Sequence, residues 1–326
     1  MAPADTQWKE LHINYIILAH KNPAQVARLI QALSTDTSRF YIHVDKNTDI
    51  HPFERLLEPI KSVSFVHSRE KGTWGDLGIV KATIHALQQI VADQRTGYCV
   101  LLSGQDYPIK STDKIAQYLT RNQGINFMNT TPLPSSKWNR GGMDRIEYYK
   151  FNLSEKRGDY VILPPLLTAD FLQNRSYYTS TIKQLLRRKT NPWAILKKRH
   201  FPGYLRPFCG DQWWTIPVET AHKLLRFLED HPDYFRYHQH TLLPDEIAIQ
   251  SVIRHLFGAE DKMAIRPTVT YINWERQGVT LPVTFDHNDI QELLNQPEEM
   301  LFARKFDMET DAKILDLLDG YINSGT

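Results

Sequence analysis

Short apolar runs alternate with segments of helical spacing along the first 120 residues. The runs Ile13 to Ala19, Phe40 to Val44 and Tyr98 to Leu102 carry no Asp, Glu, Lys or Arg and are rich in β-prone residues. Such runs predict buried strands, and Phe65 to His67 is a candidate for a fourth. The third run ends in Ser103–Gly104, which predicts a tight turn.

Two segments between these strands have the pattern of amphipathic helices. Asn22 followed by Pro23 predicts a helix start, since an asparagine side chain can cap a helix and proline fits its first position. A second helix is predicted to begin near Asp76. The apolar positions at helical spacing are Val26, Leu29, Ile30 and Leu33 in the first, and Val80, Ile84, Leu87 and Val91 in the second. This alternation predicts an α/β fold with a Rossmann-like, mostly parallel central sheet flanked by helices.

The alternation weakens beyond Gly124, and residues 129–160 are polar and irregular. The remaining predicted strands are Ile125 to Met128 and Trp213 to Ile216, and the remaining predicted helices are Val218 to Leu228, Leu243 to Phe257 and Asp311 to Ile322. Because no repeat or low-complexity linker divides the chain, we expect a single domain over residues 1–326, with halves of about 1–125 and about 126–326.

Bulk composition is that of a soluble globular protein. Hydrophobic residues make up 41% and charged residues 23% of the 326 residues, and the net charge of +2 is too small to indicate nucleic acid as a partner. Cys99, one of two cysteines, lies inside a predicted strand, which favours a buried free thiol and a reducing compartment. The N-terminal segment lacks the apolar core of a signal peptide, and no run approaches the ~18 apolar residues of a membrane span. These features predict a cytoplasmic protein.

The segment Lys183 to His200 is basic and contains no acidic residue. Its lysines and arginines are interleaved with Trp193 and with leucines and isoleucines. One interpretation is a solvated helix pair whose long cationic side chains cover apolar surface. The other is a surface that meets anionic lipid head groups or a lipid-linked phosphate acceptor at the inner face of the membrane.

Carboxylates follow two of the predicted strands. Asp45 directly follows the second run, and Asp106 comes shortly after the third. Ligands of open α/β sheets bind beyond the carboxyl ends of the strands, so both are candidates for substrate contact; the alternative is a role in turns. Neither position has the Asp-x-Asp pair that would hold a divalent ion against a nucleotide diphosphate, and no P-loop or zinc-protease motif occurs. The clustered histidines lack an acidic or thiol partner at ligand spacing, and these are His231, His238 and His240.

Six segments in chain order resemble one family of enzymes. They are YIILAHKNPAQVARLIQAL, FYIHVDKN, LLSGQDYPIKS, GDQWWTIPVETA, LLPDEIAIQSVI and LFARKFD, and together they span roughly residues 13–307. The series resembles the core-2/I-branching β-1,6-N-acetylglucosaminyltransferases and the related peptide O-xylosyltransferases. The resemblance implies a GT-A fold, a UDP-sugar donor and transfer with inversion. In such a fold, residues 1–125 would bind the nucleotide sugar, and residues 126–326 would bind the acceptor and carry the base.

The resemblance also implies where the donor and the base lie. Glu246 in the LPDE segment matches the family's catalytic base; the alternative is a carboxylate that only stabilises a helix N-terminus. Lys305 in FARKF matches the lysine that binds the diphosphate, with Arg276 or Arg304 as its partner. The other expected donor-binding residues are His20, Asp45 and Asp106.

For the acceptor, the family's Lys-x-x-Arg pair matches Lys137 and Arg140. The acidic residue expected just before this pair is missing. Asp245, beside the expected base, is a further candidate for acceptor binding. Three tryptophans are candidates for stacking on a sugar face, with core packing as the alternative, and these are Trp74, Trp213 and Trp214.

The expected reaction is transfer of a sugar, GlcNAc or xylose being favoured, to a hydroxyl of a glycan or lipid-linked saccharide. Glu246 would remove the hydroxyl proton, while Lys305 and an arginine would stabilise the leaving UDP without a metal ion. Two alternatives stay open: a xylosyltransferase that acts on serine or threonine of a peptide, and a catalytically silent module that binds sugar nucleotides or glycans. The absence of an anchor and of cysteine-rich character resembles a bacterial cytosolic member that takes part in surface-polysaccharide or glycolipid assembly.

Overall fold

A computed structural model describes residues 10–136, 138–166, 168–173, 196–258 and 264–323 of the chain, together with residues 179, 182 and 186. Its first half contains β1 (Ile13–Ala19), α1 (Pro23–Leu33), β2 (Ser38–Val44), α2 (His51–Leu57), β3 (Val63–Phe65), α3 (Leu77–Ala92), β4 (Tyr98–Ser103), β5 (Asp106–Pro108), α4 (Thr112–Arg121) and β6 (Asn126–Met128). Its second half contains β7 (Thr131–Pro132), η2 (Asn139–Gly142), α5 (Asp144–Glu147), β8 (Tyr149–Asn152), β9 (Tyr160–Leu163), α6 (Ala169–Gln173), β10 (Phe208–Cys209), β11 (Trp214–Pro217), α8 (Val218–Asp230), α9 (Pro232–His238), η4 (Pro244–Glu246), α10 (Ala248–Phe257), β12 (Ile265–Arg266), β13 (Thr270–Ile272), η5 (His287–Asp289), α11 (Ile290–Leu294), β14 (Phe302–Arg304) and α12 (Lys313–Asn323).

A seven-stranded sheet in the order β12-β6-β11-β4-β1-β2-β3 forms the centre of the molecule. β1 pairs in parallel with β2 and β4, so that Ile17 lies opposite Ile42 and Leu102. β11 is antiparallel to both of its neighbours, β4 and β6. The predicted α/β class with a mostly parallel sheet flanked by helices is confirmed. β1 has the predicted bounds, whereas β3 ends at Phe65, where the predicted strand began.

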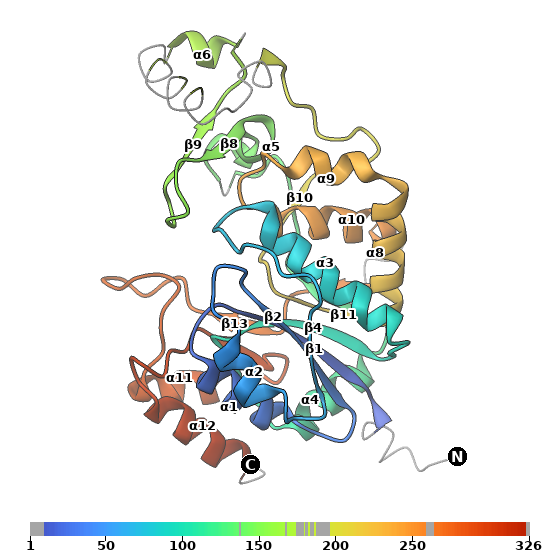
Figure 1. The fold of residues 1–326 in the computed structure, drawn as a ribbon, viewed down its shortest axis with the longest axis vertical. Helices are drawn as coiled ribbons and strands as arrows, with labels where there is room; N and C mark the ends of the chain where they lie inside the picture. The colour runs from blue at the N-terminus through green and yellow to red at the C-terminus, as the bar shows by residue number, and fades with distance from the viewer. Residues whose placement is uncertain are drawn as a thin grey trace.

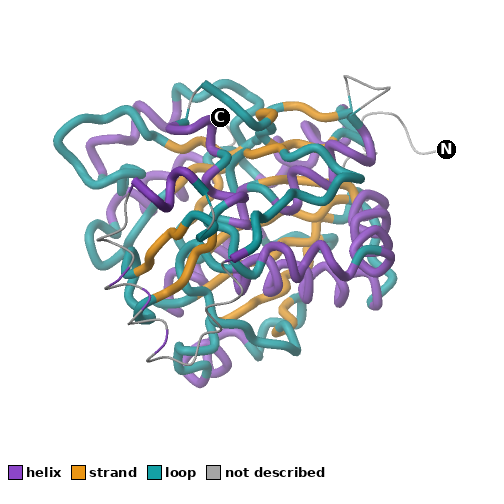
Figure 2. The backbone as a smooth tube through the Cα atoms, turned by 90° about the horizontal axis from the view of Figure 1, so that it is seen from above, coloured by secondary structure: helices purple, strands orange, loops and turns teal. Residues whose placement is uncertain are grey.

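Alternating side chains of the central strands enter two apolar cores, one on each face of the sheet. Ile17 and Leu102 belong to the core shared with α1, α2, α4 and α12. Ile16 and Leu101 belong to the core shared with α3, α8 and α10. Figures 1 and 2 show helices on both sides of these strands. Because both faces are covered, the strands form continuous apolar runs in the sequence instead of alternating ones.

The helix predicted from Leu243 onwards is interrupted beside the expected base. Pro244–Glu246 form a single 3-10 turn, η4, and α10 begins only at Ala248. The carbonyl of Glu246 accepts a hydrogen bond from the backbone N–H of Gly210 at 2.8 Å instead of one from α10. The turn therefore ties Glu246 to the end of β10 rather than to the start of the helix.

Residues 129–160, predicted to be irregular, contain helical turns and the first strand of a hairpin, β8–β9. Phe151 lies opposite Val161 in this antiparallel pair, and both belong to a small apolar cluster of their own. Lys150, the preceding residue of β8, lies on the opposite face of the hairpin and is buried. Its ammonium donates to the carboxylate of Asp76 and to the carbonyl of Trp74, which compensates for the loss of water. Apolar and polar residues thus alternate along β8, but the polar face of the hairpin contacts protein groups instead of water. Figure 1 shows the hairpin on the same side of the sheet as α3.

Both cysteines, Cys99 and Cys209, are buried free thiols, as predicted for Cys99. A reducing compartment stays a prediction. None of the helices in the described ranges is long and apolar enough to cross a membrane.

Candidate active site

The carboxyl end of β2 is fastened to the loop before α3 by Asp45. Its Oδ1 accepts the backbone N–H of Asn47 at 2.7 Å, and its Oδ2 accepts that of Gly72 at 2.5 Å. His20 follows β1 at the same edge of the sheet. Burial and the charge of Lys21 lower the pKa of His20, while Asp45 acts in the opposite direction. Asp45 and His20 therefore lie together at the strand ends, as expected, but both carboxylate oxygens of Asp45 already accept backbone amides.

Asp106 was expected to face an open crevice, but its side chain is completely buried. Its Oδ2 accepts the backbone N–H of Ser103 at 2.5 Å, and its Oδ1 accepts Nε of Arg304 at 2.9 Å. Burial raises the pKa of Asp106, and the charge of Arg304 opposes that shift. The guanidinium carbon of Arg304 in turn lies 3.9 Å from the ring centre of Trp213. Asp106 and Trp213 thus hold Arg304 in place from two sides.

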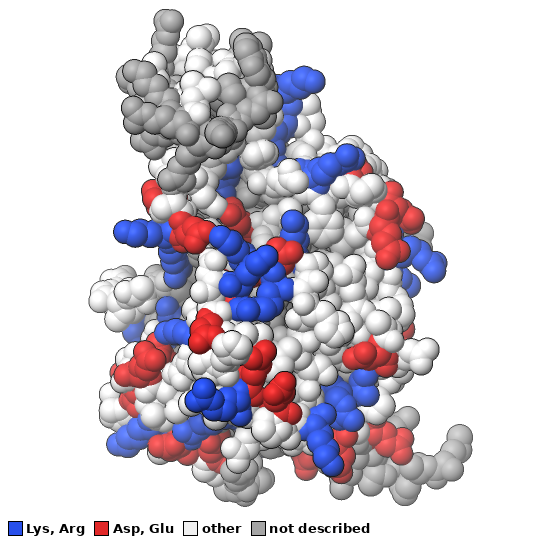
Figure 3. All heavy atoms as spheres, viewed as in Figure 1, with Lys and Arg blue, Asp and Glu red and all other residues white. Residues whose placement is uncertain are grey.

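Several cations gather around Lys305, the residue after β14. Burial lowers the pKa of Lys305, and the positive charges of Arg157, Arg304 and Lys21 lower it further. Lys21 donates to Asp307 at 2.5 Å, and the negative charge of Asp307 opposes the lowering of the pKa of Lys305. Figure 3 shows Lys and Arg side chains gathered between the sheet and the β8–β9 hairpin, with carboxylates beside them. A concentration of positive charge beyond the strand ends suits an anion such as a diphosphate. We call Lys21, Arg157, Arg304 and Lys305 the cationic group.

The loop between β8 and β9 extends over this edge of the sheet. Glu155 in that loop accepts from Lys71 and, at 3.4 Å, from Nδ2 of Asn47. Arg157 lies 5.5 Å from the ring centre of Trp74. The same ring packs against Tyr160 with 5.7 Å between centroids. Trp74, a candidate for sugar stacking, therefore also fastens the hairpin to the loop before α3.

The side chain of Glu246 is 32% exposed, and its carboxylate is paired with a buried arginine. Nη2 of Arg145 donates to Oε2 of Glu246 at 2.5 Å, and Nη1 donates to Sγ of Cys209 at 3.2 Å. Burial raises the pKa of Glu246, the charge of Arg145 lowers it, and the charge of Asp211 raises it. A half-buried carboxylate with a raised pKa is suited to accept a proton near neutral pH.

Asp245, next to Glu246, has a very different environment. It is buried, and its Oδ1 has no hydrogen-bond partner among the described residues. Burial and the charge of Glu246 raise the pKa of Asp245 to about 7. Of these two neighbouring residues, Glu246 is the one whose side chain is partly exposed to solvent. A contact between Asp245 and the acceptor stays a prediction.

One loop connects the two parts of the site. Gly72 is bonded to Asp45 at the end of β2, and the carbonyl of Gly75 accepts the backbone N–H of Leu243 at 3.2 Å. Leu243 immediately precedes the η4 turn that carries Glu246. The loop before α3 thus contacts the strand-end region on one side and the turn of the expected base on the other.

The other predicted residues fit the site less well. Trp214 is 1% exposed and packs in the core shared with α3 and α8, which agrees with core packing and not with stacking on a sugar. Arg276 donates to Asp289 and Glu292, at 2.7 Å each, whereas the arginines that act on Lys305 are Arg304 and Arg157. A role for Arg276 beside Lys305 stays a prediction that this pairing disfavours.

The expected acceptor pair is described only in part. Arg140 has a left-handed backbone (φ 52°) and donates to the hydroxyl of Tyr148. Lys137 lies outside the described residues. Most of the basic segment 183–200 also lies outside them; within it, Lys197 and Lys198 are exposed. Arg199 is buried and donates to the carbonyls of Tyr148, Tyr237 and His240, so this one cation is structural.

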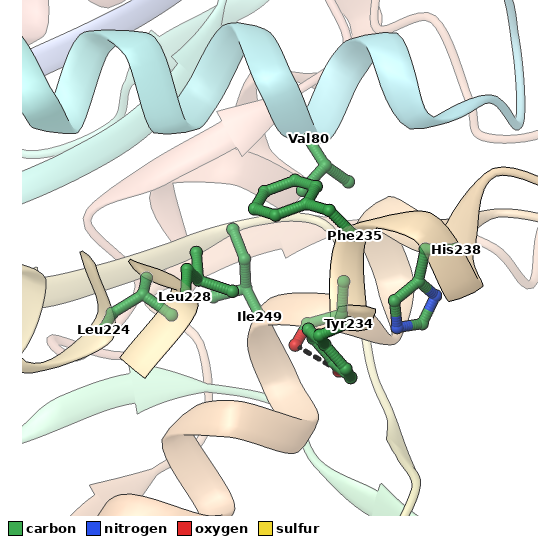
Figure 4. Close-up of a pocket in the computed structure, with 8 residues that line it drawn as sticks. Val80, Leu224, Leu228, Tyr234, Phe235, His238 and Ile249 are labelled. Carbon is green, nitrogen blue, oxygen red and sulfur yellow. Dashed lines mark hydrogen bonds between the residues drawn. The ribbon is translucent and has the colours of Figure 1, made fainter. Parts of the chain in front are cut away.

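Among the clustered histidines, His238 lies in a packed part of the interior. His238 is fully buried, its ring Nδ1 lies 3.1 Å from Oγ1 of Thr241, and burial lowers its pKa to about 3. It lines an apolar cavity of about 10 Å³ beside Tyr234 and Ile249, which is shown in Figure 4 and has room for about one water molecule. In the described ranges, the group with three potential metal ligands is Asp286, His287 and Asp311, where Asp311 accepts N–H groups from His287 and α12.

Sequence reasoning did not name four residues of the site, two beside Glu246 and two in the cationic group. Asp211 and Lys21 belong to the GDQWW and AHKNP segments that carry the family resemblance, so their positions gave a signal. Arg145 and Arg157 lie in the polar region 129–160, where neither spacing nor a motif marks them. Only the fold brings Arg145 to Glu246, across a separation of 101 residues.

Nearly the whole chain is similar in sequence to known proteins. The chain is 22% identical to human xylosyltransferase 2 over 96% of its length, and 27% identical to the xylosyltransferase oxt of Drosophila pseudoobscura pseudoobscura over 91%. It spans about a third of the length of these two relatives, 34% and 32% respectively. It is also 23% identical to the human β-1,3-galactosyl-O-glycosyl-glycoprotein β-1,6-N-acetylglucosaminyltransferase, over 98% of the chain and 72% of that protein. The family model described as Core-2/I-branching enzyme matches residues 13–295. The resemblance of the six segments is thereby confirmed, and the chain belongs to the Core-2/I-branching enzyme family.

Proposed function

We propose that the protein is an inverting glycosyltransferase that transfers a sugar from a UDP-sugar to an acceptor hydroxyl. The observation that carries this proposal is the loop before α3, which contacts both parts of the site. Gly72 bonds Asp45 at the end of β2, the ring of Trp74 lies beside Arg157 of the cationic group, and Gly75 bonds the turn of Glu246. Membership of the Core-2/I-branching family supports the same reaction class. The two charge groups match what transfer requires: positive charge for a diphosphate, and a reachable carboxylate for a proton.

In the proposed reaction, Glu246 accepts the proton of the acceptor hydroxyl as its oxygen attacks the anomeric carbon. The bond between that carbon and the diphosphate oxygen breaks, and UDP leaves with the electron pair. Attack from the face opposite to UDP inverts the anomeric centre. The transition state has oxocarbenium character, as in glycoside hydrolysis.

Lys305 and Arg304 would bind the diphosphate and stabilise the charge that grows on it. Arg304 is already oriented by Asp106 and Trp213, so little reorganisation is needed when the donor binds. Because the cationic group supplies this positive charge, we propose that no divalent metal ion is required. Arg157 on the hairpin loop would add a third cation.

Donor and acceptor are open within this proposal. The named relatives are xylosyltransferases and an N-acetylglucosaminyltransferase, so UDP-xylose and UDP-GlcNAc are the first donors to test. A glycan or lipid-linked saccharide is the favoured acceptor, and a serine or threonine hydroxyl of a peptide is the second candidate. A cytoplasmic enzyme whose basic segment 183–200 contacts an anionic membrane stays a prediction.

The experiment is a UDP-release assay over a panel of UDP-sugars, each with saccharide, glycolipid and peptide acceptors. We expect release above background hydrolysis for one donor and one acceptor class, with a β-linkage in the product by NMR. UDP-sugar binding without release for any acceptor would instead identify a silent binding module and would refute the proposed activity.

A further inference from the structure

We propose that Arg145 is a positioning residue of the transfer reaction: it keeps the carboxylate of Glu246 charged and directs one of its oxygens toward the acceptor hydroxyl. This inference rests on the proposed function of Glu246. No sequence motif marks Arg145.

Arg145 is attached to the segment of the base through both its backbone and its side chain. Its carbonyl accepts the backbone N–H of Leu242 at 2.9 Å, close to the start of the η4 turn. Its side chain is 9% exposed, and Nη1 is held by Sγ of Cys209 at 3.2 Å. The remaining terminal nitrogen, Nη2, donates to Oε2 of Glu246 at 2.5 Å. The guanidinium therefore has a fixed location relative to the carboxylate.

The backbone of Glu246 is fixed independently of Arg145. Its N–H donates to the carbonyl of Leu243 at 3.1 Å, and its carbonyl accepts from Gly210 at 2.8 Å. Gly210 cannot be replaced easily, since a Cβ there would lie 1.7 Å from the carbonyl oxygen of Asn129. With the backbone held, the direction of the carboxylate depends on the contact with Arg145. No described residue bonds Oε1, which leaves that oxygen available for an acceptor hydroxyl.

The charges around Glu246 make the role of Arg145 electrostatic as well. Asp211 and Asp245 both carry carboxyl groups close to it: the charge of Asp211 raises the pKa of Glu246, and the charge of Glu246 raises that of Asp245. Lys150 acts on Asp245, and the Cys209 thiol is neutral near pH 7 because burial raises its pKa to about 11. Arg145 is the cation that lowers the pKa of Glu246. Without it, burial and Asp211 would favour the protonated acid, which cannot accept a proton.

A buried ion pair can also serve stability alone, so the test needs a measurement that a purely structural role would not change. The pH dependence of kcat/KM is such a measurement, because its acidic limb reports the protonation of the base in the free enzyme. Loss of Arg145 raises the pKa of Glu246, so the acidic limb moves to higher pH. A structural defect would lower the rate by the same factor at every pH.

The experiment compares Arg145→Gln and Arg145→Lys with the wild type, using the donor and acceptor found in the UDP-release assay. For Arg145→Gln we expect the acidic limb to move up by about one pH unit or more, with a rate loss of about tenfold per unit below it. The rate should recover toward that of the wild type at high pH. Arg145→Lys, which keeps a charge but loses the second donor, should show a smaller displacement in the same direction.

Arg199→Gln is the matched control, since Arg199 is also a buried arginine but is bonded to carbonyl and hydroxyl oxygens rather than to a carboxylate. It should lower the melting temperature without moving the acidic limb. If Arg145→Gln does not fold, the profile of Arg145→Lys decides. A limb that coincides with that of the wild type, whatever the size of the uniform rate loss, overturns the inference.

A measurement without substrate separates this inference from the proposed function. In protein labelled with ¹³C at the glutamate carboxyl carbons, the signal absent from Glu246→Gln reports the titration of Glu246. We expect its midpoint at higher pH in Arg145→Gln than in the wild type, and an unchanged midpoint would overturn the inference. A wild-type protein that titrates as expected but releases no UDP would refute the function and leave the ion-pair effect established.

Discussion

The two sides of the candidate site have opposite charge and are built differently. On the donor side, the cationic group of Lys21, Arg157, Arg304 and Lys305 lies beyond the ends of the sheet, and Asp106 fixes Arg304 from within the core. On the other side, Glu246, Asp245 and Asp211 lie close together, with Arg145 as the cation paired to Glu246.

Each side keeps like charges together, which costs folding free energy unless a ligand or a counter-charge compensates. Among the described residues, Arg304 and Lys21 pair with Asp106 and Asp307, whereas Lys305 and Arg157 have no ion-pair partner. On the acidic side, Glu246 pairs with Arg145. A bound donor would therefore add negative charge beside Lys305 and Arg157, whereas Arg145 already supplies the counter-charge of Glu246.

Removing the base should have the largest effect. Glu246→Gln keeps the size of the side chain and can still contact Arg145, but it cannot accept a proton. We expect the transfer rate to fall by about 10²–10⁴-fold, while the Kd for UDP stays within about threefold because the cationic group is intact. Steady-state transfer and calorimetric UDP titration measure the two quantities. A variant with a tenth or more of wild-type turnover would show that Glu246 is not the base.

Removing the central cation should have the second largest effect. Lys305→Ala should lose roughly 2–4 kcal/mol of transition-state stabilisation, a decrease of roughly 30- to 1,000-fold in kcat/KM, by analogy with the loss of one oxyanion donor. In contrast to Glu246→Gln, this variant should also bind UDP more weakly. Lys313→Ala, an exposed lysine at the start of α12, is the control and should behave as the wild type. Unchanged UDP affinity in Lys305→Ala would contradict a diphosphate site at the cationic group.

The sides also differ in how far the sequence predicted them. The central strands were predictable because helices cover both of their faces. The donor-side residues other than Arg157 directly follow strands or lie in the family segments. Arg145 and Arg157 were not predictable, because their positions depend on how α5 and the β8–β9 hairpin pack. Asp76 holds the hairpin by accepting hydrogen bonds from the polar residues of β8. Arg276 was the expected partner of Lys305, yet local sequence could not show that Asp289 would bind its guanidinium.

Removing the cation on the hairpin should have a smaller effect. Arg157 is exposed, so its interaction with a diphosphate would be screened by water and salt. Arg157→Gln should raise the KM for the UDP-sugar about three- to tenfold, leave kcat nearly unchanged, and differ less from the wild type at high ionic strength. Lys156→Gln, one residue earlier in the same exposed loop, is the matched control. Equal effects of both substitutions would indicate a general charge effect rather than a contact from the hairpin.

Chelation should have the smallest effect. A metal ion at the strand ends would need free carboxylate oxygens, but both oxygens of Asp45 accept backbone amides, and those of Asp106 accept Ser103 and Arg304. The positive charge for the leaving UDP would come from lysine and arginine side chains, which a chelator cannot remove. Transfer should therefore stay within about twofold of its normal rate in excess EDTA, since no charge is lost from the donor side. Activity that disappears in EDTA and returns with Mn²⁺ would refute this proposal; Asp45 and Asp106 would then have to release their present partners to act as ligands, and the donor side would depend on a bound ion.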